Sequence, residues 1–413
     1  MEFKEFGFDA RLLEGIDAMN YTKATPVQEQ VIPIIQAGKD LIASAQTGTG
    51  KTAAFLLPII HELITAAKHE DEINALVIVP TRELAVQIEQ NLEAFSYFTP
   101  VSSIAVYGGG DGSSFETEKK ALSHGVDFVI CTPGRMISHL ASGYVKTKGL
   151  KHLILDEADR MLDMGFFDDI MKIITYLPDE RQTLLFSATM PPKIRQLGLK
   201  ILKNPEQINI SISKPPEKII QRAYIIYEPQ KIPLIKRLLK DKAYKKVVVF
   251  CSKKENVKKL SRELNRAGIL NEEIHSDLEQ TQREQVLLNF RNNKTPILVA
   301  TDILSRGIDI EDIDLVINYD VPHDGEDYVH RIGRTARAAS EGKAITLVSE
   351  AEQKKLLQIE ELLEYPVPKE SVPAELGKAP EYAPQKREVR KSTHKKPFRK
   401  NGRNHHPKPK GNQ

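Results

Sequence analysis

Short apolar runs alternate with amphipathic stretches along the first half of the chain. Runs of strand length occupy residues 40–44, 75–80, 103–107, 127–132, 152–156 and 182–187. Apolar residues at helical spacing occupy intervening stretches such as 52–63, 82–95, 135–141 and 193–202. Near-continuous apolar runs are typical of strands that are buried on both faces of a parallel sheet. The pattern therefore predicts an α/β domain with helices on both faces of a mostly parallel sheet.

A second alternation follows a short break that is rich in proline. Residues 211–217 include Pro215 and Pro216, which neither continue a helix nor donate ladder hydrogen bonds, so we expect an interdomain linker there. Strands are then predicted at 224–227, 246–251, 296–301, 315–319 and 344–348, and helices at 256–267 and 280–292. The expected organisation is a first domain over 1–210, a linker over 211–217, a second domain over 218–365 and a disordered tail over 366–413.

Composition excludes several classes of protein. The chain has 413 residues and 40% apolar content, enough to bury more than one core. It contains neither a run of some 18 apolar residues nor a basic start followed by an apolar stretch, so we expect a cytoplasmic protein with no membrane span and no secretory signal. The two cysteines, Cys131 and Cys251, are 120 positions apart and are expected to be buried strand residues.

Charge is distributed unevenly along the chain. Residues 386–410 contain eleven Lys or Arg and one acid, a local charge of +10, so the rest of the chain carries 3 minus 10, or −7. An acidic body with a basic tail favours tethering of the tail to nucleic acid through phosphate contacts, with a solubility tail as the alternative. Only one aromatic residue, Phe398, lies in this segment, so base stacking is not expected.

The segment after the first predicted strand matches a phosphate-binding loop in which Ala replaces the first Gly. Glycines let backbone N–H groups curl around phosphate oxygens, a lysine reaches the β and γ phosphates, and a hydroxyl ligates Mg²⁺. An ordinary glycine-rich turn between strand and helix is the alternative. The residues of this predicted ATP site are Ala45, Gln46, Thr47, Gly48, Thr49, Gly50, Lys51 and Thr52.

Two carboxylates follow the predicted strand at 152–156. Asp156 is placed to hold Mg²⁺ together with Thr52, and Glu157 to orient the attacking water. The alternative for Glu157 is an acid in the first turn of a helix, where negative charge is mildly stabilising. The phosphate loop and this strand end together favour a metal-dependent nucleoside triphosphatase.

With these motifs, residues 3 to about 350 resemble the DEAD-box RNA helicases of superfamily 2. The segment from Asn20 to Gln28, preceded by Phe3, is similar to the family's Q motif. The resemblance implies two tandem RecA-like domains and ATP as the nucleotide, with contacts from Phe3, Tyr21, Lys23 and Gln28. The short basic extension is also similar to the bacterial RhlE-like branch of the family.

Further motifs of the first half acquire roles through this resemblance. It implies that RNA phosphates are gripped by Pro80, Thr81, Arg82, Gly109, Thr132, Pro133 and Arg135. It also implies that Ser187 and Thr189 couple hydrolysis to strand separation through a hydrogen bond to Asp159. The alternative for these residues is that they form ordinary turns and helix caps.

The second half supplies cations and no phosphate loop. Residues 330–337 place three guanidinium groups and an imidazole close together, which a nucleoside triphosphatase needs from a partner domain. By resemblance Arg334 and Arg337 are arginine fingers, and His330 links the two domains. The resemblance adds Asp309 as a contact to the ribose of ATP, and it adds Arg283, Thr301 and Gly307 as contacts to RNA.

These expectations describe an ATP-dependent RNA helicase that acts as a monomer and unwinds short duplexes locally. Hydrolysis would require closure of the two domains, because the arginines lie across the linker from the phosphate loop. An ATP-gated RNA clamp is one alternative, and a DNA-directed translocase is another. No sequence feature identifies the target RNA or a protein partner.

Overall fold

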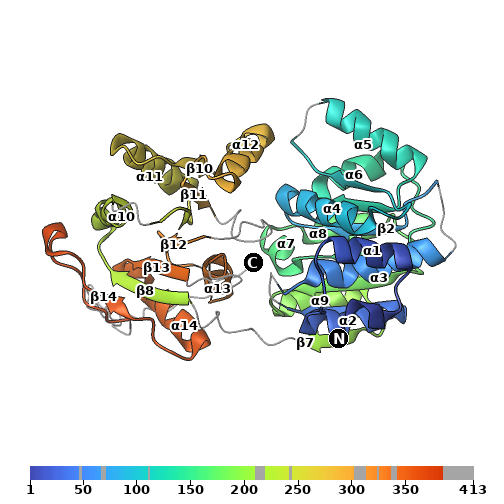
Figure 1. Ribbon diagram of the computed structural model, residues 1–413, viewed down its shortest axis with the longest axis horizontal. Helices are drawn as coiled ribbons and strands as arrows, with labels where there is room; N and C mark the ends of the chain where they lie inside the picture. The colour runs from blue at the N-terminus through green and yellow to red at the C-terminus, as the bar shows by residue number, and fades with distance from the viewer. Residues whose placement is uncertain are drawn as a thin grey trace, which may run out of the picture.

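Two seven-stranded sheets of parallel strands organise the described part of the chain. A computed structural model describes residues 1–45, 49–66, 71–109, 112–209, 219–240, 244–301, 313–322, 325–335 and 342–384. Each sheet forms its own lobe, and the lobes lie next to each other (Figure 1). The expectation of tandem RecA-like α/β domains is confirmed.

The N-terminal sheet is built from buried apolar strands. In spatial order its strands are β3 (Ser103–Val106), β4 (Phe128–Cys131), β2 (Ala75–Ile78), β5 (His152–Leu155), β6 (Gln182–Ser187), β1 (Leu41–Ser44) and β7 (Glu206–Asn209). Alternate residues point to opposite faces, so Val77 joins one apolar cluster while Leu76 joins the other. The six strands predicted in this half from apolar runs are all confirmed.

Helices cover both faces of this sheet. One face packs against η1 (Phe3–Phe6), α1 (Ala10–Ala18), α2 (Pro26–Gln36), α3 (Lys51–Thr65) and α4 (Arg82–Ser96). The other face packs against α5 (Gly112–His124), α6 (Pro133–Ala141), α7 (Ala158–Asp163), α8 (Phe167–Ile174) and α9 (Pro192–Ile201). Burial of apolar residues on both sides explains why the strand runs are continuous rather than alternating.

The C-terminal sheet has the same architecture. In spatial order its strands are β10 (Glu272–Ile274), β11 (Ile297–Thr301), β9 (Val247–Cys251), β12 (Leu315–Asn318), β13 (Gly342–Val348), β8 (Ile219–Ile225) and β14 (Lys369–Glu370). Its helices are α10 (Lys231–Lys240), α11 (Lys254–Arg266), α12 (Gln280–Arg291), α13 (Gly325–Ile332) and α14 (Gln353–Leu363), with 3₁₀ turns η2 (Glu228–Gln230), η4 (Glu350–Glu352) and η5 (Ala374–Leu376). Both cysteines are buried strand residues, as predicted.

Two predicted boundaries are wrong. Strand β8 begins at Ile219 rather than at 224, because its buried residues alternate with more exposed ones and do not form a continuous apolar run. The disordered tail does not begin at 366: Val367 is fully buried, and the hydroxyl of Tyr382 donates a hydrogen bond to Glu360 Oε2 at 2.7 Å. Val367 is an apolar residue within a polar stretch, so the sequence pattern did not indicate that this segment packs against the lobe. The predicted linker and the basic segment over 386–410 lie outside the described residues.

No helix in the described ranges combines the length and the apolar character that a membrane crossing requires.

Candidate active site

The start of α3 places a lysine at the C-terminal edge of the N-terminal sheet. Gly50 adopts a left-handed conformation (φ 89°) immediately before Lys51, the first residue of the helix. A Cβ on Gly50 would lie 2.5 Å from Gln28 Nε2, so only glycine fits this approach. Helix N-termini at the carboxyl edge of a parallel sheet attract anions. Gln46, Thr47 and Gly48 of the predicted ATP site lie outside the described residues.

The predicted adenine-binding segment is fastened to this loop. Thr25 caps α2, and the backbone N–H of Thr25 donates to Gln28 Oε1 at 2.8 Å. Gln28 Nε2 donates to the Gly50 carbonyl at 3.1 Å, and the Thr25 hydroxyl donates to the Thr49 carbonyl at 2.8 Å. Thr25 and Gln28 therefore hold the turn at Thr49 and Gly50 that leads into α3.

The aromatic residues of the same segment lie in the core. Phe3 is 3% exposed, and the centroid of its ring lies 6.0 Å from that of Tyr21. Tyr21 meets Phe95 of α4 edge to face at 5.3 Å. Lys23 is exposed and pairs with Glu2 through a short antiparallel bridge. These contacts hold the N-terminal segment against the helix layer that carries the loop.

Lys51 and Asp156 form a buried pair of opposite charges at the sheet edge. Lys51 is 6% exposed, and within the described residues its Nζ has no hydrogen-bond partner. Asp156 is 3% exposed and directly follows β5. Burial raises the pKa of Asp156 to about 6, although the charge of Lys51 opposes this shift. An incompletely satisfied cation beside a buried carboxylate suits a phosphate and a metal ion, and half-buried Thr52 occupies the next position of α3.

Glu157 occupies a strained backbone position beside this pair. Its φ of 51° and ψ of 48° place a non-glycine residue in the left-handed region, a conformation that costs on the order of 1 kcal/mol and is concentrated at functional sites. The Glu157 N–H donates to Asp156 Oδ1 at 2.9 Å, and its carboxylate accepts from Arg160 Nη1 at 3.3 Å. The turn directs two neighbouring carboxylates to the same edge of the sheet.

Asp159 joins the strand end to the segment after β6. Its Oδ2 accepts hydrogen bonds from the backbone N–H of Thr189 at 3.0 Å and from the Thr189 hydroxyl at 3.1 Å. The Asp159 N–H donates to Ser187 Oγ at 3.2 Å. The hydrogen-bond link that the resemblance predicts is present in this structure. Its role in coupling remains a prediction.

Three neighbouring strands deliver the residues predicted to grip RNA. Pro80 follows β2, and Thr81 caps α4 by accepting the Leu84 N–H at 3.3 Å. The Arg82 guanidinium lies against Gly109, which follows β3: a Cβ on Gly109 would be 2.0 Å from Arg82 Nη1. Thr132 and Pro133 begin α6 after β4. Since β3, β4 and β2 are adjacent, these segments share one edge of the sheet.

Arg135 already has a protein partner on this surface. Its Nε donates to Glu118 Oε2 at 2.6 Å, and its guanidinium lies 4.6 Å from the ring centroid of Phe115. Glu118 also contacts His139 Nε2 at 2.7 Å, and His139 stacks on Phe115. A phosphate at Arg135 would therefore share the guanidinium with the carboxylate of Glu118.

The cations of the predicted segment 330–337 that the structure describes are buried. Arg331 is fully buried and donates to Asn318 Oδ1 and to the Asp320 carbonyl, both at 3.2 Å, so it is a core residue. Arg334 and His330 are 5% and 4% exposed. Figure 1 shows α13, which carries His330, on the side of its lobe that faces the N-terminal lobe, where α7 lies. Arg337, Gly307 and Asp309 lie outside the described residues.

A buried ion pair links the two lobes. Arg283 Nη2 of α12 lies 2.6 Å from Glu83 Oε1 of α4, and the two side chains are 9% and 6% exposed. Sequence reasoning assigned Arg283 to RNA and gave no role to Glu83. Their opposite charges are visible in the sequence, but the two residues are 200 positions apart, so no local pattern indicates the pairing. Thr301 ends β11, and within the described residues its buried hydroxyl has no hydrogen-bond partner.

Comparisons with known proteins agree with this geometry. Residues 25–197 match the DEAD/DEAH box helicase family and residues 230–339 match the helicase conserved C-terminal domain. The ATP-dependent RNA helicase CshA of Listeria monocytogenes is 44% identical over 87% of this chain and 68% of its own length. The narrower likeness to the RhlE-like branch stays a prediction.

Solved structures agree over the whole fold. Dbp5 of S. cerevisiae bound to RNA and ADP BeF3 has a TM-score of 0.80 at 29% identity, covering 90% of this chain and 95% of that one. A DEAD box protein from Methanococcus jannaschii is 37% identical and has a TM-score of 0.52, covering 90% of this chain and 99% of that one. The chain belongs to the DEAD-box family and is an ATP-dependent RNA helicase, an enzyme that hydrolyses ATP.

Proposed function

We propose that this helicase binds RNA across both lobes, hydrolyses ATP in the cleft between them and unwinds short duplexes or remodels RNA–protein complexes locally. The observation that carries the proposal is the buried Lys51 beside Asp156, because its ammonium has no hydrogen-bond partner in the described part of the chain. A buried charge in that condition is costly unless a ligand completes it. ATP phosphates and a magnesium ion supply the missing charges.

Magnesium is proposed as the metal. Thr52 and Asp156 would hold it, since a hydroxyl and a carboxylate are hard oxygen ligands. When bound, the ion neutralises charge that develops on the phosphates. Lys51 holds the β and γ phosphates, while Glu157 orients the water whose oxygen attacks the γ phosphorus. The adenine is proposed to lie at the segment that includes Gln28.

Closure of the lobes completes the site. Arg334, together with Arg337, is proposed to stabilise the transferring phosphoryl group. The whole-chain TM-score to the RNA- and nucleotide-bound Dbp5 exceeds the score to the archaeal protein, although the archaeal protein is more similar in sequence. The buried Glu83–Arg283 pair also favours the arrangement in which the lobes are closed. RNA and ATP would each prefer this arrangement, so each raises the affinity for the other.

RNA is proposed to lie across the helix N-termini that follow β2, β3 and β4 and to continue onto the C-terminal lobe. The contacts are to the phosphate backbone, which implies binding without sequence preference. This surface would bend the bound RNA strand. A bent strand cannot stay base-paired with its complement, so a short duplex would separate. The core is proposed to act as a monomer, and the basic tail to tether RNA.

An ATP-gated clamp is the competing function, and Glu157→Gln tests the proposed chemistry. We expect this variant to bind ATP and RNA as the wild type does while turnover falls by roughly 10²–10⁴-fold, the usual size of a general-base contribution. Single-turnover hydrolysis and binding by fluorescence anisotropy measure the two effects separately. The exposed acid Glu180 provides a matched control, as Glu180→Gln should leave both unchanged. Substantial residual hydrolysis by Glu157→Gln would remove the proposed role of Glu157.

Unwinding separates the helicase from the clamp. A short fluorescent duplex with a single-stranded extension should separate when ATP is added to the wild-type protein. Retention of the protein on RNA without any strand separation would favour the clamp.

A further inference from the structure

An apolar pocket lies at the edge of the C-terminal sheet opposite the ATP cleft. It has a volume of about 470 Å³ and is formed by the end of α10, the turn after α11 and the first residues of β9 and β11. Strands β9 and β11 each have five residues, which places about 16 Å between this pocket and the cleft edge of the sheet. None of the residues predicted to bind ATP or RNA lines this pocket.

The walls of the pocket are aliphatic. Val247 and Ile297, which begin β9 and β11, are 1% and 6% exposed. Gly268 turns the chain with a φ of 73° directly before Ile269 and Leu270, and Leu270 is 60% exposed. A volume of 470 Å³ falls within the roughly 300–1,000 Å³ range of ligand pockets. The pocket therefore admits a large apolar side chain from outside.

One lysine lines this pocket and two more lie beside its lining residue Tyr244. Lys240 lines the pocket, and Lys343 Nζ lies 5.4 Å from the ring centroid of Tyr244. Lys245 is exposed and follows Tyr244. Within the described ranges none of these three ammonium groups forms an ion pair with a carboxylate. The carboxylate of Asp314 lies beside this rim, where it accepts the backbone N–H groups of Lys245 and Lys246 at 2.6 and 3.0 Å. Three lysines against one acid that is already engaged leave the described part of the rim positive and complementary to an acidic segment.

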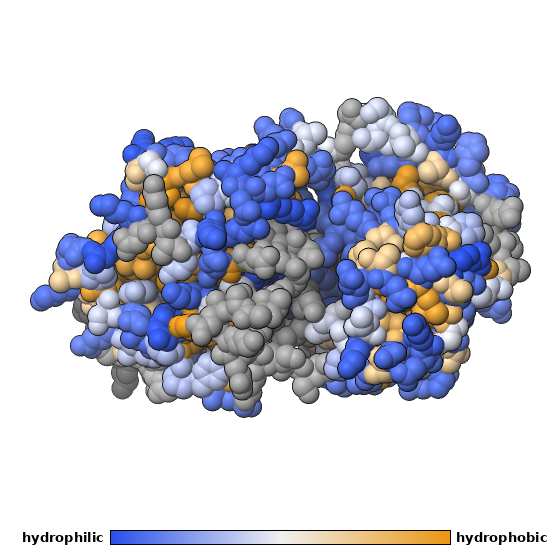
Figure 2. All heavy atoms as spheres, in the orientation of Figure 1, coloured by the Kyte–Doolittle hydropathy of each residue, from blue (hydrophilic) through white to orange (hydrophobic). Residues whose placement is uncertain are grey.

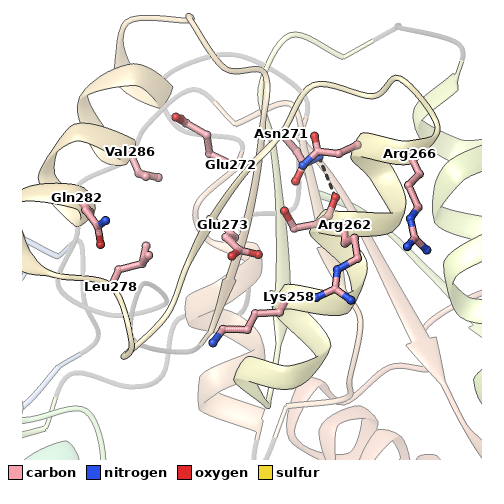
Figure 3. A pocket seen from close by; sticks show the side chains of 11 residues that line it. Lys258, Arg262, Arg266, Asn271, Glu272, Glu273, Leu278, Gln282 and Val286 are labelled. Atoms are coloured by element: carbon pink, nitrogen blue, oxygen red, sulfur yellow. Dashed lines mark hydrogen bonds between the residues drawn. The ribbon is translucent and has the colours of Figure 1, made fainter.

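A neighbouring groove on the same lobe has a different character. It lies between α11 and α12 over β10, and Figure 3 shows Lys258, Arg262 and Arg266 on one wall and Glu272 and Glu273 near the centre. Its charges are mixed, and part of them is already paired: Lys258 Nζ contacts Asp277 at 2.8 Å and Arg266 Nη1 contacts Glu263 at 2.7 Å. The groove therefore favours neither acidic nor basic partners. The apolar pocket beside Lys240 favours acidic ones.

We propose that the pocket bounded by α10, α11 and the starts of β9 and β11 is a protein docking site. Its partner is a peptide segment with one large apolar side chain flanked by aspartates or glutamates. The apolar side chain enters between Leu239 and Leu270, and the acids meet Lys240 and Lys343. Docking there leaves the cleft free, so the enzyme can be recruited to a complex while it hydrolyses ATP.

Selection from a display library of random 12-residue peptides tests this proposal on the full chain without ATP or RNA. Peptides are retained by the wild type after counter-selection on Leu270→Glu, and recovered sequences are synthesised for fluorescence anisotropy. We expect an apolar residue flanked by acids. Affinity should fall at least tenfold in Leu270→Glu and in the Lys240→Glu, Lys343→Glu double variant, and it should fall as salt rises.

Leu199 of the N-terminal lobe is the matched control, as it is 85% exposed and Leu199→Glu should bind the peptides as the wild type does. Thermal melting identifies any variant that fails to fold, and peptide binding should leave ATP turnover unchanged. Three results would overturn the proposal: no peptide that discriminates against Leu270→Glu, enrichment of basic sequences, or a double variant that loses RNA affinity but no peptide affinity. Since neither nucleotide nor RNA is present, failure here is distinct from failure of the proposed helicase mechanism.

Discussion

The two lobes share one strand order but differ at the position where the first carries its proposed ATP site. The orders β3-β4-β2-β5-β6-β1-β7 and β10-β11-β9-β12-β13-β8-β14 correspond strand for strand. Lys51 begins the helix after β1, and Lys231 begins the helix after β8. Asp156 follows β5, while Asp320 follows β12 by one residue more. The same fold thus places a lysine and an acid at equivalent sheet edges twice.

The surroundings of the two lysines are opposite. Lys231 is fully buried, and its Nζ lies 2.9 Å from Glu228, 3.2 Å from Glu352 and 3.5 Å from Asp320. Its ammonium also lies 4.9 Å from the ring centroid of Tyr319. The corresponding Nζ of Lys51 makes no hydrogen bond within the described residues.

The difference indicates that the charge of Lys231 has a structural role and that the charge of Lys51 has a functional one. Lys231 is satisfied by carboxylates of its own lobe, so no phosphate is needed there. Lys51 depends on a ligand for the same satisfaction. The contrast supports the proposal that one lobe binds the nucleotide while the other contributes cations to the transition state.

Replacing each lysine with methionine should separate these roles most widely. Lys231→Met leaves the partly buried carboxylates of Asp320 and Glu352 without a cation. It should lower the free energy of unfolding by about 3 kcal/mol, the lower end for breaking a buried pair. Lys51→Met should destabilise the protein less, because no carboxylate among the described residues accepts a hydrogen bond from the Lys51 ammonium and the raised pKa of Asp156 lets that carboxyl become neutral. It should reduce ATP turnover by roughly 10²–10³-fold. Urea unfolding and steady-state hydrolysis measure the two quantities. Equal destabilisation by both substitutions would contradict the comparison.

Asp156→Asn sharpens the same contrast through pH. The pKa of Asp156 rises from 3.8 to about 6 in the folded protein, chiefly through burial. The folded state therefore binds this proton more tightly than the unfolded state does. The associated stabilisation is fully present below about pH 4 and is lost as pH rises through 6. The asparagine variant has no such carboxyl group, so without nucleotide it should exceed the wild type by roughly 2–3 kcal/mol above pH 6.

Melting temperatures of both proteins between pH 4 and pH 8 measure this difference. The gap should close as pH falls through 6. A constant gap over this range would show that Asp156 is not the group that titrates. Addition of ATP and magnesium at pH 7.5 should stabilise the wild type alone, because the variant lacks the carboxylate proposed as metal ligand.

The ion pair between the lobes should have the smallest effect. Glu83→Gln removes one charge of a buried ion pair that joins the two lobes. We expect the RNA concentration for half-maximal ATP turnover to rise about fivefold, since coupling energies are commonly 1–3 kcal/mol. Glu263→Gln is a control within one lobe, because Glu263 pairs with Lys236 on the same lobe.

The exchanged variant Glu83→Arg with Arg283→Glu tests the pairing itself. It should recover part of the loss seen in each single substitution, as coupled residues do in a double-mutant cycle. Effects that simply add would mean that Glu83 and Arg283 act independently.

Sequence reasoning located the central strands and the charged residues at their ends, because burial on both faces makes continuous apolar runs. It missed edge strands β7, β10 and β14, whose residues are partly exposed and polar. Local pattern also gave no sign that Arg331 and Arg334 are both buried, at 0% and 5% exposed. Tertiary contacts determined both outcomes.

The lysine comparison shows the same limit. No phosphate-loop pattern surrounds Lys231, so the sequence drew no attention to it. Its three carboxylates come from separate segments of the lobe, and Glu352 is 121 residues away in the chain. The partners of Lys231 could be identified only from the packing of the folded lobe. Lys51, whose ammonium lacks such partners among the described residues, was identified from the phosphate-loop motif.

The central claim is that the N-terminal lobe holds an incomplete site to which the C-terminal lobe contributes a cation. RNA-stimulated ATP turnover of Arg334→Ala, measured alongside ATP and RNA affinity, tests it most directly. We expect nearly unchanged ATP affinity of the free protein and a loss of turnover of about a thousandfold, the lower range for an arginine finger. Turnover within a few-fold of the wild type, in a variant that folds and binds both ligands, would contradict it.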